Sequence, residues 1–173
     1  MSYSLIPDYV FNDYTALTPV FLRGHGITLL LSDLDYTLAP KRQDEPDDML
    51  RAWVKQLADA GVTLEIISNN RSPKRVDRFC RRLGVGYIGH AGKPGTRGLR
   101  AAMEKHGVPV RQTAMLGDKL LTDTLAAKRA GIVMLMVEPK GGPVGVWNCL
   151  LHAVQEPFKR LSTQDQRNNR RIA

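Results

Sequence analysis

The stretch LLLSDLDYTLAP (residues 29–40) decides the fold, because it joins a strongly apolar run to two acidic side chains. The aspartates, Asp33 and Asp35, are one residue apart and follow three leucines and a serine. A buried carboxylate without a partner costs several kcal/mol or takes up a proton. A buried strand that ends in two carboxylates therefore indicates a site at its end, where a cation or water meets them.

Strand-like apolar runs alternate with helix-like segments along most of the chain. Strands are predicted over residues 27–33, 62–68, 86–91, 113–117 and 132–137, and helices over 46–61, 72–84, 96–107 and 122–131. Strand–helix–strand repetition with short connections is typical of a parallel sheet covered on both faces. The predicted fold class is therefore α/β, a three-layer Rossmann-like parallel sheet.

The length of 173 residues and a hydrophobic content of 43% fit one globular core. We expect residues 27–156 to form this core, with residues 1–26 as an N-terminal extension packed on it. Residues 157–173 are predicted to be a polar, basic tail.

Two of the predicted helices have well-defined apolar faces. In the helix over 46–61 the face consists of Met49, Leu50, Trp53, Leu57 and Ala60. In the helix over 72–84 it consists of Val76, Phe79, Cys80 and Leu83, with Arg75, Arg78 and Arg82 on another side. Ser72 is the expected N-cap of this second helix.

The net charge of +8 is spread unevenly over the chain. Residues 71–111 carry 11 Lys and Arg against 2 Asp and Glu, a net +9, whereas residues 1–70 carry 5 against 10, a net −5. Such a basic block favours an anionic partner, whether a phosphate ester, a nucleic acid or an anionic membrane. A solvated basic surface without a specific partner is the alternative interpretation.

Polar side chains follow four of the predicted strands. Asp33 and Asp35 follow the first, SNN (residues 68–70) the second, and AGKPG (91–95) the third, while GDKLLTD (117–123) ends the fourth. In open parallel sheets, ligands bind beyond the carboxyl ends of the strands. The sequence therefore predicts one site that holds carboxylates, a hydroxyl and an ammonium group.

This set of groups suits phosphoryl transfer through an aspartate. A carboxylate can attack phosphorus and form a covalent acyl phosphate, and Mg²⁺ is the usual cation where two anions must meet. Asp33 and Asp118 are the natural ligands of that ion. Lys93 and Ser68 would hold the phosphoryl oxygens, and Asp35 can protonate the leaving alkoxide and later activate water.

The motifs DLDYT, SNN, AGKPG and GDKLLTD, in this order and spacing, resemble the four motifs of haloacid dehalogenase (HAD) superfamily phosphatases, over residues 27–139. The resemblance implies a HAD-like fold, with Asp33 as nucleophile and Asp35 as general acid and base. It assigns Ser68 and Lys93 to phosphate, and Asn69, beside Ser68, is grouped with them. Asp33, Asp118 and the backbone carbonyl of Asp35 would bind Mg²⁺, and Asp123 would support the metal site. Tyr36 departs from the pattern, because asparagine or glycine is commoner there.

The intervals between the motifs are too short for the cap domain that many members of this superfamily carry. A capless, open site suits a bulky substrate, or one that a second subunit closes over. The sequence resembles subfamily IIIA and its YqeG group, which is related to phosphatidylglycerophosphate phosphatases. This resemblance implies phosphatidylglycerophosphate as a candidate substrate. The basic helix over 72–84 would then contact an anionic membrane, with nucleic acid as the less favoured partner.

Three other functions are compatible with parts of the pattern. The same chemistry could act on a soluble sugar phosphate or nucleotide, and a small substrate would favour a homo-oligomer that closes the site. A non-catalytic phosphate- or anion-binding module would keep the pocket without turnover. A signalling receiver domain also takes phosphate on an aspartate, but Ser68 after the second strand and the acidic pair after the fourth argue against it.

The remaining features of the sequence indicate the cellular compartment of the protein. Cys80 and Cys149 have no metal or redox spacing, which suits a reducing environment. The first residues do not resemble a signal peptide, and no apolar run approaches the ~20 residues that span a bilayer. We therefore expect a cytoplasmic enzyme, with peripheral membrane association as an extension of the lipid hypothesis.

Overall fold

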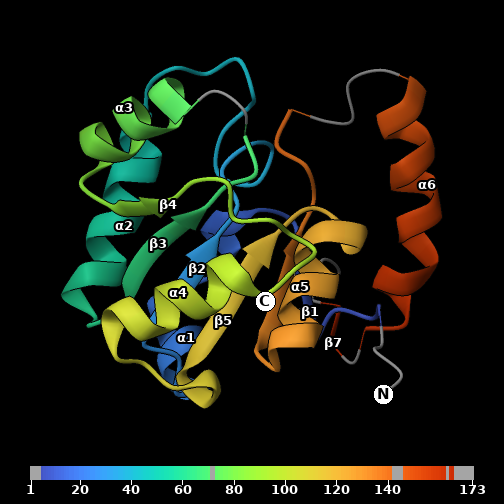
Figure 1. The fold of residues 1–173 in the computed structure, drawn as a ribbon. Coiled ribbons are helices and arrows are strands. Elements are labelled where there is room, and N and C mark those ends of the chain that lie inside the picture. The colour runs from blue at the N-terminus through green and yellow to red at the C-terminus, as the bar shows by residue number, and fades with distance from the viewer. Residues whose placement is uncertain (1–4, 71–72, 142–145, 163, 166–173) are drawn as a thin grey trace, which may run out of the picture.

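The computed structural model describes residues 5–70, 73–141, 146–162 and 164–165, and a seven-stranded sheet forms its centre (Figure 1). The order of strands is β4-β3-β2-β5-β6-β1-β7, and each recorded pairing is parallel. The strands are β1 (Tyr9–Phe11), β2 (Leu29–Ser32), β3 (Thr63–Ile67), β4 (Gly86–Ile88), β5 (Thr113–Gly117), β6 (Val133–Val137) and β7 (Gln164–Asp165). The predicted α/β class with a parallel sheet is confirmed.

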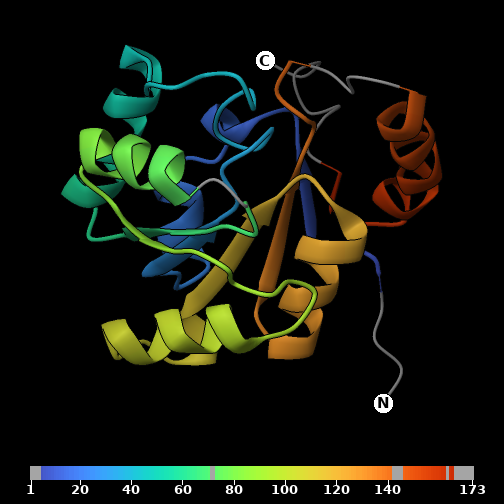
Figure 2. The same ribbon diagram turned by 45° about the horizontal axis from the view of Figure 1, so that its top comes forward.

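Helices cover both faces of this sheet, as Figure 2 shows. One buried apolar cluster joins one sheet face to α1 (Pro19–Gly24), α2 (Asp48–Asp59) and α3 (Pro73–Leu83). A second cluster joins the other face to α4 (Arg97–His106), α5 (Leu125–Ala130) and the end of α6 (Val146–Arg160). Leu29 and Leu31 of β2 belong to the second cluster and Leu30 to the first, because successive strand residues point to opposite faces. The three predicted layers are therefore present.

The helix ends follow from local sequence signals. The side chain of Asp47 accepts a hydrogen bond from the Leu50 amide at 2.8 Å and caps α2. Gly107 and Gly131 end α4 and α5 with φ angles of 63° and 76°, the left-handed region that suits glycine. The predicted N-cap of α3, Ser72, lies outside the described residues.

The apolar face of α2 is narrower than the sequence predicts. Leu50, Trp53 and Leu57 are buried, but Met49 is 63% exposed. Met49 lies about 100° around the helix axis from Leu50, so its side chain misses the sheet. The predicted inward face of α3, by contrast, is confirmed, because Val76, Phe79, Cys80 and Leu83 are all buried.

The two ends of the chain contribute more secondary structure than was predicted. The N-terminal extension supplies β1, which pairs with β6 and β7, and α6 continues through Pro157 to Arg160. The segments between β2 and β3 and between β3 and β4 carry α2 and α3, and their described residues hold no cap domain. Among all the described residues, no helix is long and apolar enough to cross a bilayer.

Candidate active site

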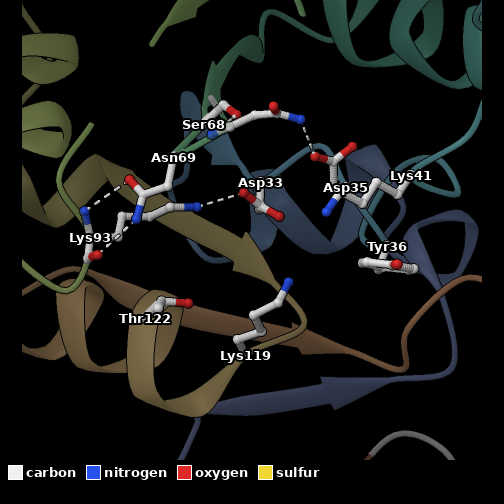
Figure 3. A pocket seen from close by; sticks show the side chains of 10 residues that line it. Asp33, Asp35, Tyr36, Lys41, Ser68, Asn69, Lys93, Lys119 and Thr122 are labelled. Carbon is white, nitrogen blue, oxygen red and sulfur yellow. Dashed lines mark hydrogen bonds and ion pairs between the residues drawn. The ribbon is translucent and has the colours of Figure 1, made fainter. Parts of the chain in front are cut away.

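Most of the predicted site residues line one pocket at the carboxyl ends of β2, β3, β4 and β5 (Figure 3), and Asp118 and Asp123 are buried beside Asp33, which lines it. The pocket has a volume of about 370 Å³. Its lining consists of Asp33, Asp35, Tyr36, Lys41, Ser68, Asn69, Asn70, Lys93, Lys119 and Thr122. The parallel topology thus brings together four motifs that are far apart in the sequence.

The ammonium group of Lys93 lies between two carboxylates. Its Nζ is 2.7 Å from Asp33 Oδ1 and 2.8 Å from Asp123 Oδ1, and the side chain is only 2% exposed. Burial alone would lower the pKa of Lys93, but the charges of Asp123 and Asp33 outweigh it and raise this pKa. Lys93 is therefore held in its charged form at the floor of the pocket.

Three buried aspartates form an acidic cluster next to Lys93. Carboxylate oxygens of Asp33, Asp118 and Asp123 all lie within 4.8 Å of one another. Burial, together with the charges of Asp123 and Asp33, raises the pKa of Asp118 to about 6 although Lys119 opposes the shift. A set of carboxylate oxygens crowded in this way is the donor set that a hard divalent cation prefers. The residues present therefore fit a magnesium ion.

Two further groups contact Asp118. The Thr37 hydroxyl donates to Asp118 Oδ1 at 3.2 Å, and Lys119 Nζ lies 2.9 Å from the same oxygen. Burial disfavours the charge on Lys119, but Asp118, Asp33 and Asp123 outweigh burial and raise its pKa. Lys119 is therefore a second cation beside the acidic cluster, which the sequence had not singled out.

Asp123 is placed by an unusual turn and by a glycine. The sequence predicted a helix from residue 122, but the structure begins with a π-helical turn, η3 (Leu120–Thr124), which runs into α5. The Cβ that a side chain at Gly117 would add lies only 2.5 Å from Asp123 Cβ. Only glycine at the end of β5 therefore leaves room for Asp123 in this position.

The SNN segment (residues 68–70), which follows β3, is hydrogen-bonded to Lys93, which follows β4. Ser68 is buried, and its hydroxyl accepts a hydrogen bond from the Asn70 amide at 3.0 Å. The side chain of Asn69 donates to the Lys93 carbonyl at 2.7 Å and accepts from the Lys93 amide at 3.1 Å. Because both polar atoms of Asn69 face the Lys93 backbone, this geometry favours a positioning role over the predicted phosphate contact.

The carboxylate of Asp35 is held by two donors. Asn70 Nδ2 lies 2.6 Å from Oδ2, and Arg75 Nη1 lies 2.7 Å from Oδ1. Arg75 also donates to the Gln43 carbonyl at 2.8 Å, and its side chain is only 13% exposed. The sequence placed Arg75 on the basic side of this helix, away from the core, because nothing in the helical pattern reveals its partner across the fold.

Two of the other three arginines of α3 also have acidic partners. Arg81 pairs with Asp77, and Arg82 pairs with Glu45. Arg78 is exposed, and among the described residues it has no ion-pair partner. Three of the four arginines of α3 therefore have acidic partners, whereas Arg78 and Lys74 stay exposed without an ion pair to the described residues.

Tyr36 adopts a backbone conformation that explains why asparagine or glycine is commoner at its position. Its φ angle is 69°, in the left-handed region where glycine and asparagine are tolerated best. Its ring lines the pocket and lies 5.5 Å from Lys119 Nζ, measured to the ring centroid. This cation–π contact offsets part of the backbone strain.

The sequence is similar to those of known hydrolases. The family model of the haloacid dehalogenase-like hydrolases matches residues 10–131. The "Probable phosphatase YqeG" of Bacillus subtilis is 28% identical over 134 residues, which cover 78% of this chain and 77% of that protein.

Solved structures of low sequence identity share the fold. The 3-deoxy-D-manno-octulosonate 8-phosphate phosphatase of Yersinia pestis matches with a TM-score of 0.56 and 15% identity, over 85% of this chain and 75% of that one. The related phosphatase YrbI of Haemophilus influenzae matches with a TM-score of 0.55 and 18% identity, over 78% of this chain and 90% of that one.

Proposed function

Because the chain belongs to the haloacid dehalogenase-like hydrolases, as its motifs predicted, we propose that it is a Mg²⁺-dependent phosphatase that hydrolyses a phosphate monoester through an aspartyl phosphate. One observation carries this proposal. The Asp33 carboxylate lies at the carboxyl end of β2, 2.7 Å from the Lys93 ammonium and beside the carboxylates of Asp118 and Asp123. These proximities support a site in which Asp33 is the nucleophile, Lys93 binds phosphate, and Asp118 and Asp123 serve the metal.

Asp33 and Asp35 perform the bond changes in this proposal. A carboxylate oxygen of Asp33 attacks phosphorus, and the bond from phosphorus to the ester oxygen breaks. Asp35 gives its proton to the leaving alkoxide. Asp35 then takes a proton from a water molecule, whose oxygen attacks the phosphorus of the aspartyl phosphate and releases inorganic phosphate and free Asp33.

Lys93 and Ser68 stabilise the charge on the transferring phosphoryl group. Lys93 is buried and charged, and its ammonium already contacts the nucleophile, so it can follow the phosphoryl oxygens during the reaction. The Ser68 hydroxyl, fixed by the Asn70 amide, can donate its proton to a second phosphoryl oxygen. Asn69 keeps the Lys93 backbone in place.

Asp33, Asp118 and the backbone carbonyl of Asp35 would hold the magnesium ion, and Asp123 supports the site. When bound, the ion supplies the positive charge that lets an anionic phosphate approach an anionic carboxylate. The phosphatase of Moraxella catarrhalis, which has the same fold at a TM-score of 0.51 and 17% identity over 80% of this chain and 90% of that one, was solved with magnesium, phosphate and KDO.

Phosphatidylglycerophosphate is the candidate substrate, and a soluble sugar phosphate or nucleotide is the alternative. A pocket that no cap covers among the described residues supports a bulky substrate, and the motif resemblance to the YqeG group implies this lipid. Because three of the four arginines of α3 are ion-paired, a membrane-facing interpretation has less support than their number suggested. The structural neighbours named for a sugar phosphate favour the alternative.

The test is Mg²⁺-dependent phosphate release from a panel that includes both classes of substrate. The panel contains phosphatidylglycerophosphate in mixed micelles, sugar phosphates, nucleotides and phosphorylated oligonucleotides. We expect Asp33→Asn to lower the rate by on the order of 10³-fold or more while the protein stays folded. Asp48→Asn, the same change on an exposed residue of α2, is the matched control.

Each outcome has a definite meaning. Normal phosphate release by Asp33→Asn would eliminate the aspartyl-phosphate mechanism. Preference for the lipid supports the first substrate, and preference for a soluble ester supports the second. A parent enzyme that binds phosphate but releases none from any ester would support a non-catalytic anion-binding module.

A further inference from the structure

Helix α6 contacts the turn that carries the fourth motif, GDKLLTD. The helix lies outside the residues that the family model matches. That match ends at residue 131, whereas α6 spans Val146–Arg160. The side-chain oxygen of Gln155 accepts a hydrogen bond from the backbone amide of Leu120 at 3.0 Å. Figures 1 and 2 show α6 beside the turn that leads into α5.

The amide of Leu120 needs an acceptor from elsewhere in the fold. Leu120 is the first residue of η3, and the first amides of a helical turn have no acceptor within the helix. The side chain of Lys119, the residue at the N-cap position, makes no capping hydrogen bond. Leu120 is also buried, so water cannot replace the missing acceptor. Gln155 therefore supplies the cap that the local sequence lacks.

The turn that Gln155 caps is the one that carries Asp123. The amides of Asp123 and Thr124 both donate to the Lys119 carbonyl, at 2.9 and 3.1 Å. The Asp123 carboxylate accepts from the Lys119 amide at 3.1 Å through Oδ2 and meets Lys93 through Oδ1. The position of the turn thus sets where the Asp123 carboxylate lies in the acidic cluster.

Gln155 is itself firmly anchored. Lys159 is one helical turn further along the same face of α6, and its fully buried ammonium lies 2.6 Å from Glu138, just after β6. Phe158 packs on the apolar cluster of that sheet face. Beyond the helix, the Ser162 hydroxyl donates to the Asp8 carbonyl at 3.1 Å. This end of α6 is therefore fixed relative to the sheet.

We propose that Gln155 is a positioning residue for the metal site. Through the Leu120 amide it fixes η3, and through η3 it fixes Asp123 beside Asp33 and Asp118. Helix α6 is then part of the active-site structure rather than only a cover for the sheet. This inference rests on the proposed function, because it assumes that the acidic cluster binds magnesium.

The experiment compares three variants of the full chain. Gln155→Leu removes the acceptor, Gln155→Glu keeps an oxygen at the same place, and Val154→Ala changes a neighbouring side chain that is 56% exposed. Mg²⁺ binding is measured by isothermal titration calorimetry without substrate. Phosphate release is then measured against Mg²⁺ concentration, with unfolding temperature as a check of folding.

We expect Gln155→Leu to weaken Mg²⁺ binding by about tenfold, the size usual for a group that orients a metal ligand. The rate at saturating Mg²⁺ should fall less than the affinity. Gln155→Glu should stay within about threefold of the parent, and Val154→Ala should match it. Amide hydrogen exchange over residues 117–125 should be faster in Gln155→Leu only.

Two results would overturn the inference. One is unchanged Mg²⁺ binding and hydrogen exchange in folded Gln155→Leu, and the other is equal losses in Gln155→Leu and Gln155→Glu. If Gln155→Leu does not fold, Gln155→Ala and Gln155→Glu are compared in the same way, and equal behaviour of these two refutes it. A parent protein that neither binds Mg²⁺ nor releases phosphate would instead refute the proposed function.

Discussion

Replacing Gly117 by alanine tests whether the close approach of β5 to Asp123 is essential. The added Cβ would lie 2.5 Å from both Cβ and Cγ of Asp123 and 2.6 Å from its Oδ2. Carbon atoms in proteins pack at about 3.5–4.0 Å, so about 1 Å of movement is required. Because β5 is hydrogen-bonded to β2 on one side and to β6 on the other, the strand cannot withdraw and Asp123 must move.

Gly117→Ala should lower both the free energy of unfolding and the catalytic rate. Forcing an extra methyl group into a packed core costs about 1–3 kcal/mol. For a chain of this length, 2 kcal/mol lowers the unfolding temperature by roughly 4–8 °C. Displacing a group of the catalytic site by about 1 Å costs about 10²-fold in rate. Activity should therefore fall much more than stability.

The assay measures phosphate release and thermal unfolding for Gly117→Ala beside Gly24→Ala. Gly24 ends α1, and no heavy atom lies within 4 Å of the Cβ that alanine would add there. We expect the control to keep full activity and an unfolding temperature within about 2 °C of the parent. Phosphate release by Gly117→Ala within about threefold of the parent would refute the steric argument.

Two further predictions concern the charged groups of the pocket. Arg75→Leu should lower the catalytic rate about tenfold, because Asp35 loses one of its two donors, whereas Arg78→Leu should have no effect on phosphate release. Without metal, the raised pKa of Asp118 means that the folded state binds more protons than the unfolded state between pH 4 and 6. The free energy of unfolding should therefore fall as pH rises through that interval, and less in Asp118→Asn. Chemical denaturation in EDTA at a series of pH values measures the difference, and equal slopes would contradict it.

The sequence predicted the centre of the fold well because its signals there are local. Strand β5 was predicted at its observed bounds, and the buried face of α3 was predicted residue by residue. Parallel topology then placed the four motifs at one edge of the sheet without any knowledge of side-chain contacts. The predicted strands and helices, and the place of the site at the sheet edge, thus follow from hydrophobic periodicity and strand direction alone.

The contacts that organise the site could not be predicted, because each joins residues far apart in the sequence. Arg75 reaches Asp35 across 40 positions, and Gln155 reaches Leu120 across 35. The sequence around Arg75 would look the same whether this arginine faced solvent or a buried partner. The same is true of Gln155. The three-residue strand β1 was missed because so short a run carries no usable period.

The charge balance of the pocket gives the strongest physical reason for a metal ion. Three carboxylates, those of Asp33, Asp118 and Asp123, face two ammonium groups, those of Lys93 and Lys119. The described residues of the cluster thus leave one negative charge uncompensated, and burial keeps water from screening it. Burial, together with the charges of Asp123 and Asp33, raises the pKa of Asp118. Since a phosphate ester adds up to two more negative charges, the substrate and a divalent cation should each strengthen the binding of the other.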